Sequence, residues 1–226
     1  MPRKTIYTLG ILGTLYLLYN FYQIFLVIPV DALQGNIFRI IFVHVPAAFT
    51  AFTFYGVAVV GSIGFLLTKD FKWDSLAVSA VEVATMFTLV NLATGSIWGR
   101  VEWGIWWAWD ARMTSQLMCF LLYLGYLLMR PAIAEPQQRG VMSAVLAIFA
   151  AADIPIVFMA IRLHNVRTQH PGPVLETGTL AKVYWPPFFG DYAAFLLLAT
   201  AMMLVRLHQE SNRREIDSLR REVHAI

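Results

Sequence analysis

The sequence predicts an all-α integral membrane protein in which six helices cross the bilayer and both ends of the chain lie in the cytoplasm. Three observations support this fold class. Hydrophobic residues make up 58% of the 226 residues, charged residues only 14%, and the mean hydropathy is +0.62. The apolar residues gather in long runs, and about 18 of them suffice to cross a bilayer core of ~30 Å. More of the basic residues fall in every second connection between the runs, which indicates how the chain is oriented in the membrane.

Six apolar runs are expected to form the spans. The first follows Arg3 and Lys4 directly and is too long for a signal peptide, whose apolar core has about 7–15 residues. The fourth run is short, but the segment from Asp110 to Met129 supplies roughly twenty helical residues. The runs lie near residues 7–30, 46–68, 76–97, 114–129, 141–161 and 189–207.

The distribution of basic residues predicts which connections face the cytoplasm. With the N-terminus inside, eleven of the 17 Lys and Arg residues lie on the inner side of the membrane. Because basic residues in short loops favour the cytoplasm, this orientation is preferred. We therefore expect a six-span membrane domain over residues 1–208 and a charged, helical cytoplasmic tail over residues 209–226.

Several classes of function are excluded by what the sequence lacks. Cys119 is the only cysteine, so disulfides within the chain, CxxC redox chemistry and cysteine-rich metal sites are excluded. The chain has no GxxxxGK[ST] motif, so any nucleotide must act through a partner. The net charge of +3 and the pI near 9.1 reflect membrane topology better than nucleic-acid binding, because the basic residues are dispersed between spans.

The connection after the third run carries most of the tryptophan, in the stretch WGRVEWGIWWAWDARMTS. A helix over this stretch would present four side chains on one face, namely Trp103, Trp106, Trp107 and Asp110. Trp98 and Trp109 would point elsewhere. An interfacial aromatic belt and a ligand platform explain the tryptophans about equally well. The nearby Arg100 and Arg112 suit a platform more than a simple anchor.

Three of the five histidines fall in predicted outer connections, namely His44, His164 and His170. Pro46 is expected in the first turn of the second span, which puts His44 just outside the membrane core. Each histidine alone is more simply an interfacial hydrogen-bonding group. Together, two outer imidazoles beside an aromatic platform suit haem, whose iron takes axial histidine ligands. Arg100 and Arg112 would then pair with its propionates.

These motifs resemble the CcmC family, also called cytochrome c maturation protein C or haem exporter protein C. The tryptophan-rich stretch is similar to the WGxWWxWDxR signature of a superfamily of haem-handling membrane proteins. The sequence HVPAAF at His44 is similar to the first histidine motif of the family. Asp110 is followed by Ala111, whereas related synthase-type members carry Asp-Pro at this point. The six-span layout extends the resemblance over nearly the whole chain.

The resemblance implies a haem-transfer protein rather than an enzyme, although a lyase-like role in attaching haem to the chaperone fits the same site. Such a protein binds haem b at the periplasmic face of the bacterial inner membrane and delivers it to the haem chaperone CcmE. Its implied partners are CcmE, the ABC transporter subunits CcmA and CcmB, and the small membrane protein CcmD. The implied haem contacts are His44, His170, Trp98, Trp103, Trp106, Trp107, Trp109, Asp110, Arg100 and Arg112, with His44 and His170 on the iron.

Individual residues keep alternative roles. His164 is the alternative to His170, because RLHNVRTQHPG lacks the two tryptophans that precede the second histidine of the family. Asp110 is expected to cap the fourth span, and for Arg112 the alternative to a propionate contact is pairing with Asp110.

Two other functions also remain open. One is a synthase-type lyase that attaches haem to apocytochrome c. The other is a transporter that moves haem through the spans past the ionisable Glu82 and Asp153. Against the transporter, Asp153 could satisfy backbone groups freed by Pro155, and Glu82 could reach water.

Overall fold

The computed structural model describes residues 3–160, 162, 170 and 180–224, which form a helical bundle without β-strands in these ranges. The all-α class is therefore confirmed. The helices are α1 (Arg3–Tyr22), α2 (Ile41–Thr68), α3 (Phe71–Trp103), α4 (Ala111–Met129), α5 (Pro136–Ala151), α6 (Asp153–Met159) and α7 (Trp185–His224). A π-helical turn, Gln23–Val27, extends α1, and 3-10 turns lie at Asn36–Ile40, Arg130–Ala132 and Lys182–Tyr184.

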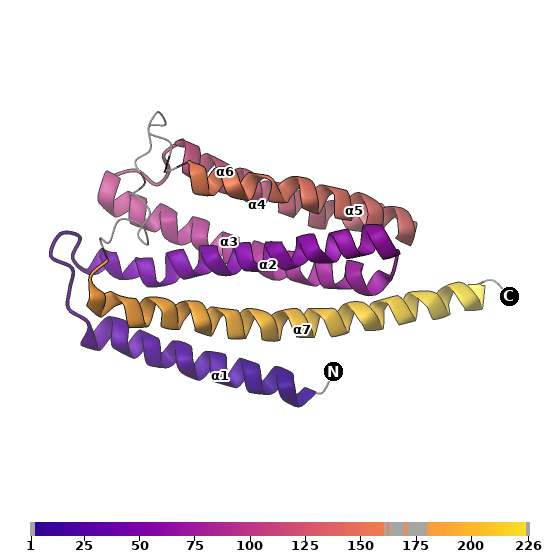
Figure 1. Ribbon diagram of the computed structural model, residues 1–226, viewed down its shortest axis with the longest axis horizontal. Coiled ribbons are helices and arrows are strands. Elements are labelled where there is room, and N and C mark those ends of the chain that lie inside the picture. Colours follow the sequence, from indigo (N-terminus) through magenta and orange to yellow (C-terminus); the bar gives the residue numbers. More distant parts are fainter. Residues whose placement is uncertain (1–2, 161, 163–169, 171–179, 225–226) are drawn as a thin grey trace.

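The long helices run roughly along one axis, with α1 beside α7 at one edge and α4 to α6 at the opposite edge (Figure 1). The contact between α2 and α3 is the most extensive, and α1 packs chiefly against α7. The N-terminus and C-terminus lie toward the same end of the bundle. The connection between α3 and α4 lies at the other end, so the tryptophan-rich stretch is far from the termini.

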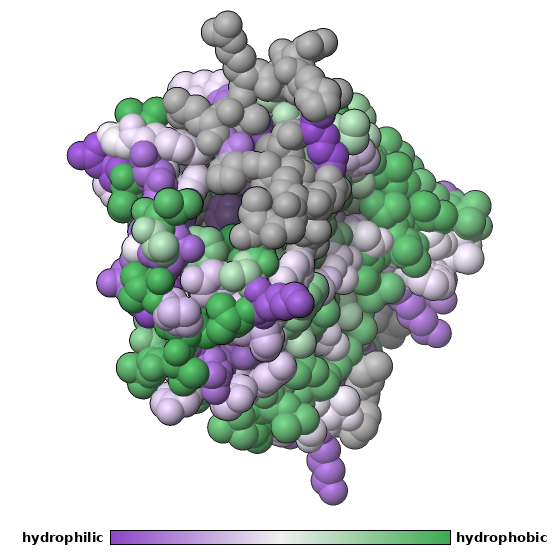
Figure 2. Space-filling view, turned by 60° about the vertical axis from the view of Figure 1, so that its left-hand side comes forward, coloured by the Kyte–Doolittle hydropathy of each residue, from purple (hydrophilic) through white to green (hydrophobic). Residues whose placement is uncertain are grey.

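Several helical segments in the described residues are long and apolar enough to cross a membrane. They are Arg3–Val27, Asn36–Thr68, Phe71–Trp103, Pro136–Met159 and Lys182–Arg220. The predicted fourth span corresponds to α4, whose 19 residues cover about 28 Å. Hydrophobic side chains cover much of one flank of the bundle (green in Figure 2), as expected of a surface that faces lipid. The chain is therefore a multi-pass membrane protein, and the count of six spans and their orientation stay predictions.

Small residues allow α2 and α3 to pack closely. Ala51, Ala58 and Gly61 on α2, and Ala77, Ala80 and Ala84 on α3, are buried in this contact. A Cβ atom added at Gly61 would lie only 2.9 Å from the carbonyl oxygen of Trp73, so a larger residue would force the helices apart. Close approach through small residues is typical of helices in membranes. It holds the first turns of α2 beside the last turns of α3.

The expected helix through the tryptophan-rich stretch does not form. Helix α3 ends at Trp103, and Gly104 follows in the left-handed conformation with φ of 76°. Glycine adopts this conformation without steric cost and commonly ends helices in this way. Residues 104–110 are not helical. The shared helical face predicted for Trp103, Trp106, Trp107 and Asp110 is therefore wrong.

The predicted start of the second span is also corrected. The 3-10 turn Asn36–Ile40 leads directly into α2, so the helix begins at Ile41 and Pro46 lies inside it. His44 consequently belongs to the first turn of α2 instead of preceding the helix. At the other end of the chain, α7 continues past residue 208 to His224 without a break. The division at residues 208 and 209 stays a prediction.

Candidate functional site

A small cavity lies at the end of the bundle opposite the termini, between α2, α3 and α4. Its volume is about 40 Å³. The lining residues are His44, Asn91, Leu92, Gly95, Trp98, Trp103, Trp107, Arg112, Met113, Gln116 and His170. Figure 2 turns this end of the molecule forward, and hydrophilic and hydrophobic side chains are intermixed on it. The cavity thus brings together His44, His170, Arg112 and three of the tryptophans singled out in the sequence.

The two histidine side chains in the cavity lie close together. The ring centroids of His44 and His170 are 6.4 Å apart, and the ring planes are inclined by 32°. Both side chains are partly buried. His164, the alternative to His170, lies outside the described residues. The family resemblance implied that His44 and His170 act together on one iron, and the tertiary structure adds the distance between the two rings.

Thr94 on α3 fixes the protonation of the His44 ring. The Thr94 hydroxyl donates its proton to the carbonyl oxygen of Val90 at 2.7 Å, and its oxygen lies 3.0 Å from Nδ1 of His44. A hydroxyl group has one proton to donate. The Thr94 oxygen therefore accepts a hydrogen bond from Nδ1–H of His44. In a neutral ring this leaves the lone pair on Nε2.

Asn91 and Gly95 also contact the His44 side chain or its backbone. The amide nitrogen of Asn91 donates to the backbone oxygen of His44 at 3.0 Å and lies 3.2 and 3.3 Å from its two ring nitrogens. A Cβ atom added at Gly95 would lie 2.9 Å from Cε1 of His44, so glycine is needed for this close approach. Residues 91, 94 and 95 follow the i, i+3, i+4 spacing of one helix face.

Four residues of the site, Asn91, Thr94, Gly95 and Gln116, were not predicted from the sequence. For the first three, the available signal was polar and small residues at helical spacing inside an apolar run, in NLATG. Such a pattern indicates a helix face that is not turned to lipid, but it does not identify the residue that this face contacts. Gln116 is a buried polar residue of α4 that also lines the cavity.

Three of the five clustered tryptophans form part of the cavity wall. Trp98 packs edge-on against Trp103 with ring centroids 5.0 Å apart, and its ring centroid is 6.4 Å from that of His170. Trp107 contributes an indole N–H that is buried without a hydrogen-bond partner among the described residues. Trp106 and Trp109 are 60% and 77% exposed and do not line the cavity. Trp98, expected to point away from Trp103 and Trp107, in fact joins them.

The charged residues of the stretch have different surroundings. Asp110 caps α4 by accepting a hydrogen bond from the backbone N–H of Met113 at 2.8 Å, which confirms the predicted cap. Arg112 lines the cavity and donates to the carbonyl oxygen of Val157 at 3.2 Å. Arg100 is exposed, donates to the carbonyl oxygen of Gly104 and does not line the cavity.

The donor set of the cavity favours one kind of ligand. The described residues contain no cluster of three or more His, Cys, Asp or Glu side chains that could chelate a bare metal ion. The cavity instead offers two imidazoles, three indole rings and one guanidinium group. Such a set suits a flat aromatic ligand that carries a metal at its centre and an acidic edge.

Comparison with known proteins places the chain in one family. Residues 1–222 match the family described as Heme exporter protein C. Heme exporter protein C of Bradyrhizobium diazoefficiens is 35% identical over 193 residues, which cover 84% of this chain and 73% of the relative. The protein of Paracoccus denitrificans is 34% identical, covering 84% and 80%, and that of Escherichia coli K12 is 34% identical, covering 79% and 72%. With a family match over nearly its whole length and relatives of this similarity, the chain belongs to the Heme exporter protein C family.

Proposed function

We propose that this protein holds haem in the cavity between α2, α3 and α4 and passes it to a haem chaperone during the maturation of c-type cytochromes. The observation that carries the proposal is the 6.4 Å separation of the His44 and His170 rings. Two imidazoles this close together could both hold the iron of a haem, which histidine commonly ligates. The separation of the two rings therefore suits an iron bound by both.

The hydrogen bonds around His44 support its role as an iron ligand. Ligating histidines usually donate their second ring N–H to a neighbouring acceptor, which fixes the tautomer and the orientation of the ring. The Thr94 oxygen, 3.0 Å from Nδ1, is such an acceptor. Nε2 of His44 would then be the nitrogen available to hold iron.

The cavity in its present form has room for only a few water molecules. Its volume is about 40 Å³, and one water needs roughly 10–15 Å³ of such space. A porphyrin is many times larger than one water. Haem would therefore enter only if the cavity widened, for which the rings of Trp98, Trp103 and Trp107 would have to move apart.

Two donors on the cavity wall suit the acidic edge of haem. Arg112 carries a guanidinium group, which pairs well with a carboxylate, and Trp107 has an unpaired buried N–H in the described part of the chain. We assign these two groups to the haem propionates. Arg100 is oriented toward the end of α3 and is not needed for this pairing.

The exposed tryptophans suit the partner rather than the cavity. Trp106 and Trp109 are exposed, and the Trp109 ring centroid lies 5.9 Å from that of the cavity residue Trp107. Aromatic side chains are enriched at protein interfaces. We assign them to the docking of the chaperone CcmE. The ABC transporter subunits CcmA and CcmB and the small protein CcmD complete the proposed assembly. In this proposal the cargo is haem b, and the cavity faces the periplasm from the bacterial inner membrane.

Absorption spectroscopy tests the proposal. The purified protein is supplied with haem in detergent, with and without the chaperone, as wild type and as the variants His44→Ala, His170→Ala and His164→Ala. We expect a Soret band in the wild type that is lost or shifted in the first two variants and kept in the third. Circular dichroism confirms that each variant is folded. A wild type that stays colourless after haem supply would refute haem binding.

A further inference from the structure

A second and larger cavity lies at the end of the bundle that holds the termini. Its volume is about 260 Å³, and it is bordered by α3, by α4 and its connection to α5, by α5 and by α7. Its charged lining residues are Glu82, Arg130, Arg139, Glu210 and Arg213. Neither the cavity at His44 nor the proposed haem transfer involves these residues.

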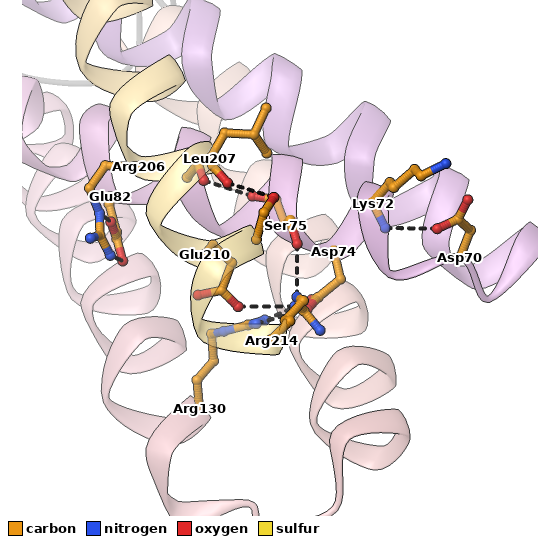
Figure 3. Close-up of polar contacts among 12 residues, drawn as sticks. Asp70, Lys72, Asp74, Ser75, Glu82, Arg130, Arg206, Leu207, Glu210 and Arg214 are labelled. Atoms are coloured by element: carbon orange, nitrogen blue, oxygen red, sulfur yellow. Dashed lines mark hydrogen bonds and ion pairs between the residues drawn. The ribbon is translucent and has the colours of Figure 1, made fainter. Parts of the chain in front are cut away.

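One of the cavity arginines is already neutralised by a buried carboxylate. Asp74 is 3% exposed and forms two hydrogen bonds of 2.8 Å with the guanidinium group of Arg130 (Figure 3). The same carboxylate accepts from Arg214, which also pairs with Glu210 at 3.1 Å. Arg130 is thus held in place by Asp74, and its position is fixed before any ligand arrives.

The remaining carboxylate of the cavity is also paired. Glu82 on α3 forms an ion pair with Arg206 on α7, as Figure 3 shows. Each of these carboxylates, Asp74, Glu82 and Glu210, therefore has an arginine partner. None of those partners is Arg139 or Arg213.

Arg139 and Arg213 remain as an excess of positive charge. Both line the cavity, and no carboxylate of the described residues forms an ion pair with either of them. The nearby Glu135 is engaged by the backbone N–H groups of Gln137 and Gln138. Like charges around a partly enclosed space are unfavourable without a counter-ion. The cavity therefore favours a ligand with a negative charge.

The position of the cavity along α7 indicates where the anion comes from. The apolar part of α7 ends at Val205, and Glu210 and Arg213 lie about 8–12 Å further along the helix. This places the charged wall near the headgroup region of the bilayer. The lining also includes the apolar side chains of Val78, Leu127 and Pro131. Next to it, Leu128 is 67% exposed on the surface of the bundle.

We infer that this cavity binds a phosphate group carried by the headgroup of an acidic phospholipid. Phosphate oxygens accept hydrogen bonds from Arg139 and Arg213, for which guanidinium groups are well suited. Basic pockets between membrane helices commonly hold acidic headgroups. The excess positive charge selects against choline headgroups, which carry a positive charge of their own. The bound lipid links α5 to α7.

Thermal unfolding of the purified protein in detergent tests the inference. The midpoint is measured with added phosphatidylglycerol, with phosphatidylcholine and with inorganic phosphate. We expect phosphatidylglycerol to raise the midpoint of the wild type by several degrees more than phosphatidylcholine does. The variant Arg139→Gln/Arg213→Gln is expected to require at least tenfold more phosphatidylglycerol for the same rise.

A matched control separates the cavity from general charge effects. The variant Lys72→Gln/Arg220→Gln removes the same charge from exposed positions outside the cavity and is expected to respond like the wild type. Native mass spectrometry of the folded fraction should show acidic phospholipid retained by the wild type and the control but not by the arginine variant. This second readout does not depend on the stability of the variant.

The possible outcomes distinguish a lipid phosphate from a soluble phosphate, and both of these from the absence of a binding site. Stabilisation by inorganic phosphate equal to that by the lipid, and lost in the arginine variant, would assign the site to a soluble anion. Equal shifts with phosphatidylglycerol and phosphatidylcholine would overturn the inference. So would full retention of the acidic lipid by the arginine variant. None of these results depends on haem binding at His44.

Discussion

At the end of the bundle that holds the termini, buried charged groups are paired with one another, whereas the cavity around His44 is lined mostly by neutral polar and aromatic groups. Asp74 there is shared by Arg130 and Arg214. At the His44 cavity, the indole N–H of Trp107 and the side-chain amide nitrogen of Gln116 find no acceptor among the described residues. Buried polar groups are normally satisfied, so unpaired donors indicate a place for a ligand. The first arrangement stabilises the bundle, and the second suits binding.

The largest expected effect comes from breaking the buried ion pairs. In Asp74→Ala, two guanidinium groups lose their shared carboxylate, and we expect a loss of roughly 3–5 kcal/mol in the free energy of unfolding. In the wild type, burial lowers the pKa of Arg130, but the hydrogen bonds to Asp74 and nearby charges raise it above its ordinary value overall. In the variant this support from Asp74 is lost, but a guanidinium group stays protonated in proteins, so Arg130 does not relieve the loss by deprotonation. Unfolding in detergent measures the effect.

Glu215→Ala serves as the control for this prediction. Glu215 is exposed on the same helix as Arg214, so its removal is expected to leave the unfolding midpoint nearly unchanged. If Asp74→Ala were no less stable than this control, the terminal end of the bundle would not depend on its ion pairs.

An intermediate effect is expected at the other end, on ligand affinity rather than stability. Thr94→Val keeps the shape of the side chain but removes the acceptor for Nδ1–H of His44. Loss of such a partner weakens binding by about 10–100-fold. Haem titration followed at the Soret band measures this, given that the protein binds haem. Thr94→Ser retains the acceptor and should bind like the wild type. Equal affinity of the valine variant would show that Thr94 does not orient the ring.

The smallest effect is expected at the entrance to α4. Asp110→Ala removes the side chain that caps the helix, and loss of such a cap typically costs about 1 kcal/mol. Asp110→Asn keeps an acceptor at the same position and should retain most of the stability. Chemical unfolding compares the three proteins. A loss of haem binding in the asparagine variant would contradict a role limited to capping.

Local features of this protein were predictable because they depend on neighbouring residues along the chain. The apolar runs indicated a helical membrane protein, and the step from Trp109 to Asp110 indicated a cap that the structure confirms. The same reasoning failed at Gly104, where a single left-handed residue ends α3 and redirects the tryptophans that follow. Periodicity assumes a continuous helix, and it does not identify the residue at which the helix stops.

The sequence by itself determined the helical membrane class and drew attention to His44, His170 and the tryptophan-rich stretch. Only the tertiary structure decided that Thr94 holds the His44 ring, that Trp98 joins the cavity wall, and that Arg139 and Arg213 face one space. The contact of Thr94 with His44 joins α3 to α2, and the cavity shared by Arg139 and Arg213 joins α5 to α7. They depend on how far each helix is rotated and how closely it approaches its neighbour. Small residues such as Gly61 and Gly95 set that approach, and their effect appears only once the helices are packed.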